Sequence, residues 1–148
     1  MKTMSLNVVN PSEDDRWDRY VENHPKGSIF HHSAWKEVLE KTFPHLKPLY
    51  LIVEDAQQNL LGCFPFFFVK SRLTGRRLVS LPFSLFCDPL IDSSIGFDVF
   101  VKGIIEKQEE LNASFIEMRT RCDGNVFGSS HFQEYIGFKN HRLSLEND

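Results

Sequence analysis

The sequence has 148 residues, of which 41% are hydrophobic, and a formal net charge of −3. This length suits one folded domain, and the slight negative charge argues against non-specific binding of DNA, which requires a basic face. No apolar run approaches the roughly 20 residues of a membrane-spanning helix. Three widely spaced cysteines without a CxxC pair indicate neither a metal site nor a disulfide framework, and we expect a cytoplasmic protein.

A short first strand is predicted at residues 5–9, and hydrophobic periodicity predicts two helices after it. The first helix, with Ser12 as its N-cap, is ended by Pro25 and Gly27, and the second starts after Ser33 and is stopped by Pro44. The apolar face of the first helix recurs at helical spacing through Trp17, Tyr20, Val21 and His24.

The next part of the chain reads as an antiparallel meander. Its strands are expected at residues 49–53, 60–69 and 76–81, separated by polar turns at 55–59 and 71–75. Pro65 lies inside the second of these strands. Because proline cannot donate a ladder hydrogen bond, we expect that strand to be bulged or partly at an edge there.

The remaining pattern alternates between helices and strands. Helices are predicted at residues 94–112, with Asp92 as N-cap, and at 131–136, and strands at 114–119 and 138–145. The order is then β-α-α-β-β-β-α-β-α-β. It predicts an α+β fold in which helices pack on a mixed, largely antiparallel sheet.

Two groups of polar residues are candidates for a functional site. Lys70, Arg72, Arg76 and Arg77 surround the turn at Gly75, and they either contact phosphate or form a solvated hairpin tip. His31 and His32 either contact substrate, one of them acting as a base, or satisfy backbone groups where the second helix begins. Asp88 either orients an amine or stabilises a turn.

Four segments resemble, in order, the N-terminal half of the Fem-type, GNAT-like acyltransferases. They are GSIFHHSAWKEVL (27–39), LYLIVEDAQQNLLGCFPFFFVKS (49–71), GRRLVSLPF (75–83) and SFIEMR (114–119). In this family two GNAT-like lobes form one transferase, which moves an acyl or aminoacyl group onto an amine. Its bridge-building members take an amino acid from aminoacyl-tRNA and add it to a cell-wall peptide. The resemblance implies that residues 1–148 are a GNAT-like domain equivalent to the first lobe.

The same resemblance implies the partners and the donor. The domain would work with a C-terminal GNAT-like lobe or a partner chain, on a cell-wall precursor, without a cofactor of its own. The acyl donor of the full enzyme would be aminoacyl-tRNA or acyl-CoA. The 14 phenylalanines would either fill the core or partly face the second lobe.

The resemblance also implies the substrate-binding residues, although it identifies no catalytic residue. These residues are Lys36, Arg76, Arg77, Phe86 and Asp88. Lys36 lies about one helical turn before the place where some bridge enzymes have a phosphate-contacting lysine. Many relatives have a tyrosine and glycines just before Pro-Leu, whereas this chain has Phe86-Cys87-Asp88 there.

The donor motif of acyl-CoA enzymes is not present. GNAT enzymes that use acyl-CoA usually have a Q/R-x-x-G-x-G/A loop at a helix N-terminus, where amide N–H groups bind the pyrophosphate. The nearest segment here is DSSIGF, with Gly96 alone. Two alternatives therefore remain beside the Fem-like lobe: a stand-alone, non-catalytic binding module of GNAT-like fold, and an acyl-CoA-dependent N-acetyltransferase with a degenerate motif.

Overall fold

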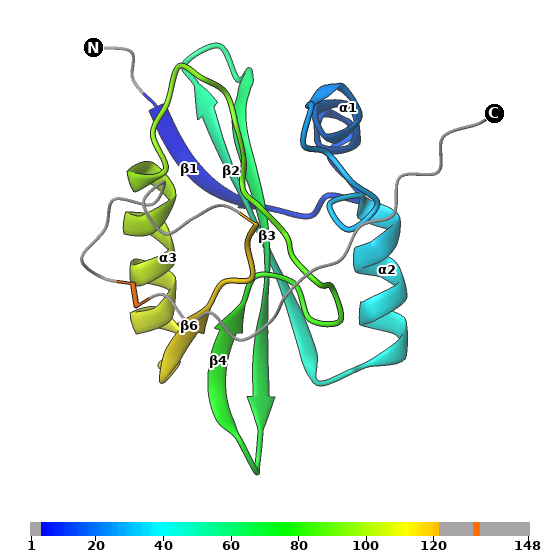
Figure 1. The fold of residues 1–148 in the computed structure, drawn as a ribbon, viewed down its shortest axis with the longest axis vertical. Coiled ribbons are helices and arrows are strands. Elements are labelled where there is room, and N and C mark those ends of the chain that lie inside the picture. Colours follow the sequence, from blue (N-terminus) through cyan, green and yellow to red (C-terminus); the bar gives the residue numbers. More distant parts are fainter. Residues whose placement is uncertain (1–3, 122–131, 134–148) are drawn as a thin grey trace, which may run out of the picture.

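The computed structural model describes residues 4–121 and 132–133 (Figure 1). Its elements are β1 (Met4–Val9), α1 (Asp15–Asn23), α2 (Ser33–Thr42), β2 (Leu46–Asp55), β3 (Leu60–Ser71), β4 (Gly75–Val79), β5 (Leu90–Ile91), α3 (Asp98–Glu110) and β6 (Phe115–Glu117). The helix predicted at 131–136 and the strand at 138–145 lie outside the described residues, apart from 132–133, which form neither helix nor strand.

The strands form a mixed, largely antiparallel sheet, as predicted. Its order is β1-β2-β3-β4-β6, and the short β5 pairs with β3. The pairs of the predicted meander, β2–β3 and β3–β4, are antiparallel, whereas β4 and β6 are parallel. Parallel neighbours need a crossover connection, and α3 lies in this one (Figure 1).

Helices cover both faces of the sheet: α1 and α2 lie on one face and α3 on the other (Figure 1). The alternation of side chains along a strand divides the core accordingly. In β2, Tyr50 and Ile52 pack with Trp17 and Leu39 under α1 and α2. Leu51 and Val53 instead join the cluster beneath α3, which also includes Phe64, Phe66, Phe100 and Ile104. The predicted α+β arrangement is confirmed.

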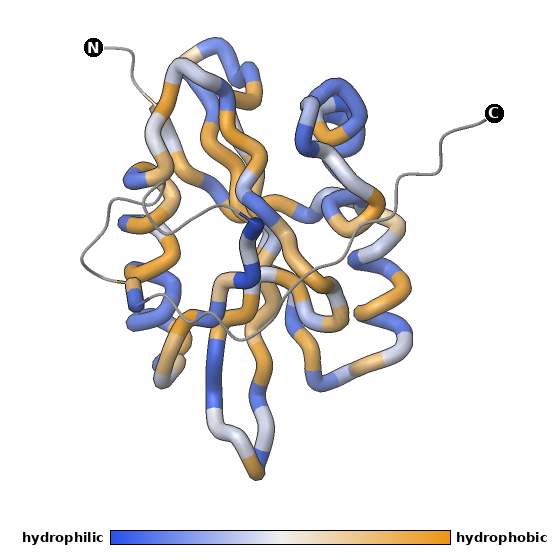
Figure 2. Tube along the Cα trace, in the orientation of Figure 1, coloured by the Kyte–Doolittle hydropathy of each residue, from blue (hydrophilic) through white to orange (hydrophobic). Residues whose placement is uncertain are grey.

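The hydropathy of the residues agrees with a sheet at the core and helices at the surface. The central strands are coloured mainly as hydrophobic in Figure 2, whereas α1 is mainly hydrophilic. Of α1, Trp17 and Val21 are buried, as the helical spacing predicted. Among the phenylalanines of the described chain, Phe83 and Phe115 are exposed, and the buried ones are Phe64, Phe66, Phe67, Phe97 and Phe100.

Two helix starts differ from the prediction. Asp14, not Ser12, is the N-cap of α1 and accepts a hydrogen bond from the Arg16 N–H, because a turn closed by Asn10 comes first. Similarly, Asp92 accepts a hydrogen bond from the Ser94 N–H in a turn, and α3 begins only at Asp98.

Pro65 was predicted at a bulge or partly at an edge, and it lies where one side of the strand is unpaired rather than at a bulge. It pairs with Tyr50 inside a central strand, and the register shift between β2 and β3 lies at Val53/Glu54. On the other side of β3, pairing with β5 ends at Cys63 and pairing with β4 begins at Phe67. Proline is tolerated at this interruption because no ladder donor is needed there.

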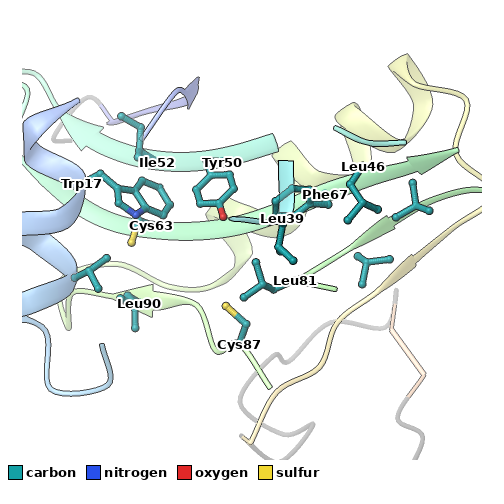
Figure 3. Packing of buried hydrophobic residues seen from close by; sticks show 13 residues of the cluster. Trp17, Leu39, Leu46, Tyr50, Ile52, Cys63, Phe67, Leu81, Cys87 and Leu90 are labelled. Atoms are coloured by element: carbon teal, nitrogen blue, oxygen red, sulfur yellow. The ribbon is translucent and has the colours of Figure 1, made fainter. Parts of the chain in front are cut away.

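The hydroxyl of Tyr50 has no hydrogen-bond partner among the described residues, although its ring is fully buried between Trp17 and Phe67 (Figure 3). Burial raises the pKa of Tyr50 well above its usual value, so the group stays a neutral phenol. An unpaired buried polar group is costly. We therefore expect Tyr50→Phe to raise the free energy of unfolding by about 1 kcal/mol, measured by urea denaturation.

Tyr20→Phe is the matched control. The Tyr20 hydroxyl donates a hydrogen bond to the Leu61 carbonyl oxygen at 3.0 Å. Removing it leaves that acceptor without this donor, so stability should fall by about 1 kcal/mol. A loss of stability in Tyr50→Phe as large as in Tyr20→Phe would mean that the Tyr50 hydroxyl is hydrogen-bonded after all.

Candidate functional site

The chain between β4 and β5 lies against the residues that follow β6. The Ser80 N–H donates to the Glu117 carbonyl at 2.9 Å, and the Cys87 N–H donates to the Arg119 carbonyl at 2.6 Å. The Ser80 hydroxyl accepts the Arg119 N–H at 2.8 Å. Between these anchors Leu81 has a φ of 120° and Phe83 a φ of 61°. Such values are rare in residues other than glycine and mark a path imposed by the surrounding structure.

This path brings together Phe86, Asp88 and Arg121. The buried Asp88 carboxylate accepts the Arg121 backbone N–H at 2.7 Å and its Nε at 3.3 Å. The Arg121 guanidinium carbon lies 3.9 Å from the centre of the Phe86 ring, a cation–π arrangement. The guanidinium is therefore held from two sides in one orientation.

His31 connects this group to the α1–α2 connection. Its Nε2 lies 2.7 Å from the Asp88 carbonyl oxygen, and its Nδ1 lies 2.8 Å from the Ser28 hydroxyl. The Trp17 indole N–H donates to the His31 carbonyl at 2.7 Å. Burial lowers the pKa of His31 below its usual value, so the ring is neutral at pH 7. We call His31, Phe86, Asp88 and Arg121 the His31–Arg121 cluster.

The neighbouring His32 has a different role. It is the N-cap of α2, where its side chain accepts the Ala34 N–H, and its Nε2 lies 3.5 Å from an Asp18 carboxylate oxygen. One of the two readings of the histidine pair, a backbone group satisfied where the second helix begins, is thus confirmed for His32.

Lys36 makes its polar contacts away from this cluster. Lys36 is buried on α2, where its Nζ donates to Asn10 Oδ1 at 2.9 Å and pairs with Glu40 at 3.0 Å. Its amine is thus already engaged by two partners within the fold. Its predicted role as a substrate contact stays a prediction.

Arg76 and Arg77 lie on opposite faces of the sheet, because successive residues of a strand alternate. Arg77 is the cross-strand neighbour of Val69, whose side chain packs under α1 and α2. Arg76 is the neighbour of Lys70 on the other face. The two side chains therefore leave the strand on different faces, and their predicted role in binding substrate stays a prediction.

Sequence reasoning placed Phe86 and Asp88 in one site, and the structure brings these two side chains to the same arginine. It missed Arg121 and Ser28. Arg121 lies two residues beyond the predicted strand at 114–119, so no strand pattern in the sequence indicated its position. Ser28 precedes His31 by one turn, and its hydroxyl was available as a partner for the imidazole.

The N-terminus of α3 has an acidic residue in its first turn and lacks the glycine-rich loop that binds a coenzyme A diphosphate. One carboxylate oxygen of Asp98, in the first turn of α3, lies close to the position that a Cβ on Gly96 would take. A carboxylate satisfies the positive end of the helix dipole and repels a further anion. The two residues therefore do not form the glycine-rich diphosphate cradle of an acyl-CoA site.

Metal sites and membrane-spanning helices are both absent from residues 4–121 and 132–133. No group of three or more histidine, cysteine, aspartate or glutamate side chains in this part of the chain could hold a metal ion. None of its helices is long and apolar enough to cross a membrane.

No protein-family model and no curated protein matches the sequence. Solved structures of acetyltransferases share its fold. The ribosomal-protein-alanine N-acetyltransferase from Brucella melitensis biovar Abortus 2308 is 10% identical with a TM-score of 0.59, over 97% of this chain and 100% of that one. Glucosamine-6-phosphate N-acetyltransferase from Arabidopsis thaliana is 12% identical with a TM-score of 0.56, over 95% and 99%.

A third solved acetyltransferase has the same fold. The aminoglycoside 6'-N-acetyltransferase AAC(6')-Ih from Acinetobacter baumannii is 12% identical with a TM-score of 0.56, over 94% of this chain and 99% of that one. The chain thus has the GNAT acetyltransferase fold, and the predicted fold class is confirmed. At such low identity the likeness shows the fold alone, because one fold supports many functions.

Proposed function

We propose that this domain is the acceptor-binding lobe of a Fem-like acyl or aminoacyl transferase, acting on an amine of a cell-wall or envelope precursor. Three observations support the proposal. The domain has the GNAT fold. The segment GRRLVSLPF, part of the Fem resemblance, leads directly into the His31–Arg121 cluster. The cluster presents a cation in a fixed orientation.

The observation that carries the proposal is the placement of Arg121. Phe86 lies against its guanidinium, and Asp88 accepts its Nε–H. Neither Nη group donates a hydrogen bond to another described residue, so both remain for a ligand within this part of the chain. Two N–H groups in the plane of a guanidinium suit a carboxylate or a phosphate. Cell-wall precursors carry both groups.

The proposal places the acyl donor elsewhere. Asp98 and Gly96 do not form a diphosphate cradle at α3, so the donor, aminoacyl-tRNA or acyl-CoA, would bind to a second GNAT-like lobe or to a partner chain. In that arrangement the present domain binds and orients the acceptor, and the second lobe completes the reaction. The same acidic α3 terminus favours a second candidate, a GNAT-like binding module without catalysis.

Ligand-induced stabilisation tests the proposal. We expect a soluble muramyl-peptide precursor with a free amine to raise the melting temperature, since a ligand at about 100 times its Kd stabilises by roughly 2.7 kcal/mol. Acetyl-CoA at the same concentration should give no shift. Arg121→Gln should weaken precursor binding at least about tenfold, because it removes charge-assisted hydrogen bonds.

Arg72→Gln is the matched control, since Arg72 is exposed in the β3–β4 turn. It should bind the precursor like the wild type. Stabilisation by acetyl-CoA and not by the precursor would overturn the proposal in favour of a degenerate N-acetyltransferase. A response to neither ligand would overturn it in favour of the non-catalytic module.

A further inference from the structure

The hydroxyl of Ser28 and the ring of His31 form a hydrogen-bonded pair whose direction follows from its surroundings. A carbonyl oxygen only accepts, so the contact of 2.7 Å with Asp88 requires a hydrogen on His31 Nε2. In the neutral ring Nδ1 then carries a lone pair. The Ser28 hydroxyl, 2.8 Å away, must donate its proton to Nδ1. The lone pairs of the serine oxygen consequently face away from the imidazole.

His31, the base of this pair, is buried and its backbone is held by two hydrogen bonds. His31 is 2% exposed, its carbonyl accepts the Trp17 indole N–H at 2.7 Å, and its backbone N–H donates to the Ser28 carbonyl at 2.9 Å. Besides Asp88, the charged or titratable groups that act on it are His24 and Arg121. The ring therefore cannot turn away from Ser28 without losing its contact with Asp88.

Ser28 itself lies within reach of solvent. It is half-buried, and the next residue, Ile29, is 68% exposed. Ser33, the nearest serine along the chain, differs in both respects: it is buried, and its hydroxyl donates to the Asp18 carboxylate. Ser28 is therefore only partly buried and has a hydrogen bond to a neutral nitrogen base, the arrangement that activates a nucleophilic serine.

We propose that Ser28 is a nucleophile that accepts an acyl group from an activated ester or thioester, with His31 as its general base. Ser28 Oγ attacks the acyl carbon while its proton passes to His31 Nδ1. The bond from the acyl carbon to the leaving oxygen or sulfur then breaks, and the imidazolium returns the proton to that atom. The products are an O-acylserine, a free alcohol or thiol, and a neutral His31.

The inference shares acyl chemistry with the proposed function but does not depend on it. The step needs no second lobe, no diphosphate cradle and no acceptor bound at Arg121. Acetylation of Ser28 should therefore proceed without any muramyl-peptide precursor present. A failure of acceptor binding and a failure of serine acylation are separate results.

Acylation by p-nitrophenyl acetate, a small activated ester, tests the proposal directly. We expect the wild-type chain to release nitrophenolate in a burst and to gain one acetyl group, which peptide mapping by mass spectrometry places on Ser28. Ser28→Ala should remove the burst. His31→Gln should slow it by about 10²-fold or more, the contribution typical of a general base.

Ser12→Ala is the matched control, because Ser12 is exposed and has no hydrogen bond to a histidine among the described residues; it should label like the wild type. Mapping on the wild-type chain alone decides the question if His31→Gln does not fold. Acetylation that misses Ser28, or that reaches Ser12 and Ser28 at the same rate, would overturn the proposal.

Discussion

Replacing Trp17 by alanine is expected to lower the free energy of unfolding by about 3–5 kcal/mol, the usual range for truncating a buried aromatic residue. Trp17 is fully buried, and its ring lies 4.9 Å from that of Tyr50 (Figure 3). The substitution leaves a cavity between α1 and the sheet that the neighbouring strands cannot close. Urea denaturation followed by circular dichroism measures the loss.

The indole also has a polar role that a second variant isolates. Its N–H donates to the buried His31 carbonyl at 2.7 Å. Trp17→Phe retains an aromatic ring but leaves that carbonyl without its donor, at a cost of about 1–3 kcal/mol. We also expect Trp17→Phe to slow acetylation of Ser28, because His31 loses one of its anchors. A loss below 1 kcal/mol in Trp17→Ala would contradict the packing described here.

The parts of the fold that the sequence predicted well depend on local patterns. The apolar spacing of Trp17 and Val21 marks α1, and polar residues at 55–59 mark the β2–β3 turn, where Asp55 accepts the N–H groups of Gln57 and Asn59. Periodicity and turn chemistry act over a few residues. They can therefore be read without knowing which segments meet in space.

The backbone conformation of the chain between β4 and α3 could not be predicted from such local patterns. Its two-residue strand β5 exists only through pairing with Gly62 and Cys63 of β3, which is a long-range contact. Leu81 and Phe83 adopt positive φ values that their residue types disfavour. This path is imposed by the pairing of β4 with β6 and by the burial of Ser80. No local propensity of the residues predicts it.

In the candidate site, too, local sequence indicated some residues, whereas long-range contacts determine the others. Phe86 and Asp88 were found from a resemblance in the segment that contains them, whereas their partners come from distant parts of the chain. His31 lies 57 residues from Asp88, and Arg121 lies 33 residues beyond it. The two neighbouring arginines, Arg76 and Arg77, were grouped by closeness in sequence, although strand alternation separates them onto two faces.

The second large effect is expected at Gly27, which determines how the α1–α2 connection leaves α1. A Cβ on this residue would approach the Val21 carbonyl oxygen to well under 3.0 Å. The Gly27 N–H also donates to the His24 carbonyl at 2.8 Å, so the tight turn cannot move aside freely. We expect Gly27→Ala to lower the free energy of unfolding by roughly 2–3 kcal/mol, as overpacking does, in urea denaturation.

Gly96→Ala is the matched control, since the atom that its Cβ would meet is the far end of the Asp98 side chain. That carboxylate can rotate away, whereas the backbone oxygen of Val21 belongs to a helix. The control should therefore change stability by less than about 0.5 kcal/mol, as surface substitutions usually do. Because Ser28 follows Gly27 directly, Gly27→Ala should also slow Ser28 acetylation, and Gly96→Ala should not. Equal effects of the two alanines on stability and on acetylation would show that the turn at Gly27 does not position the serine.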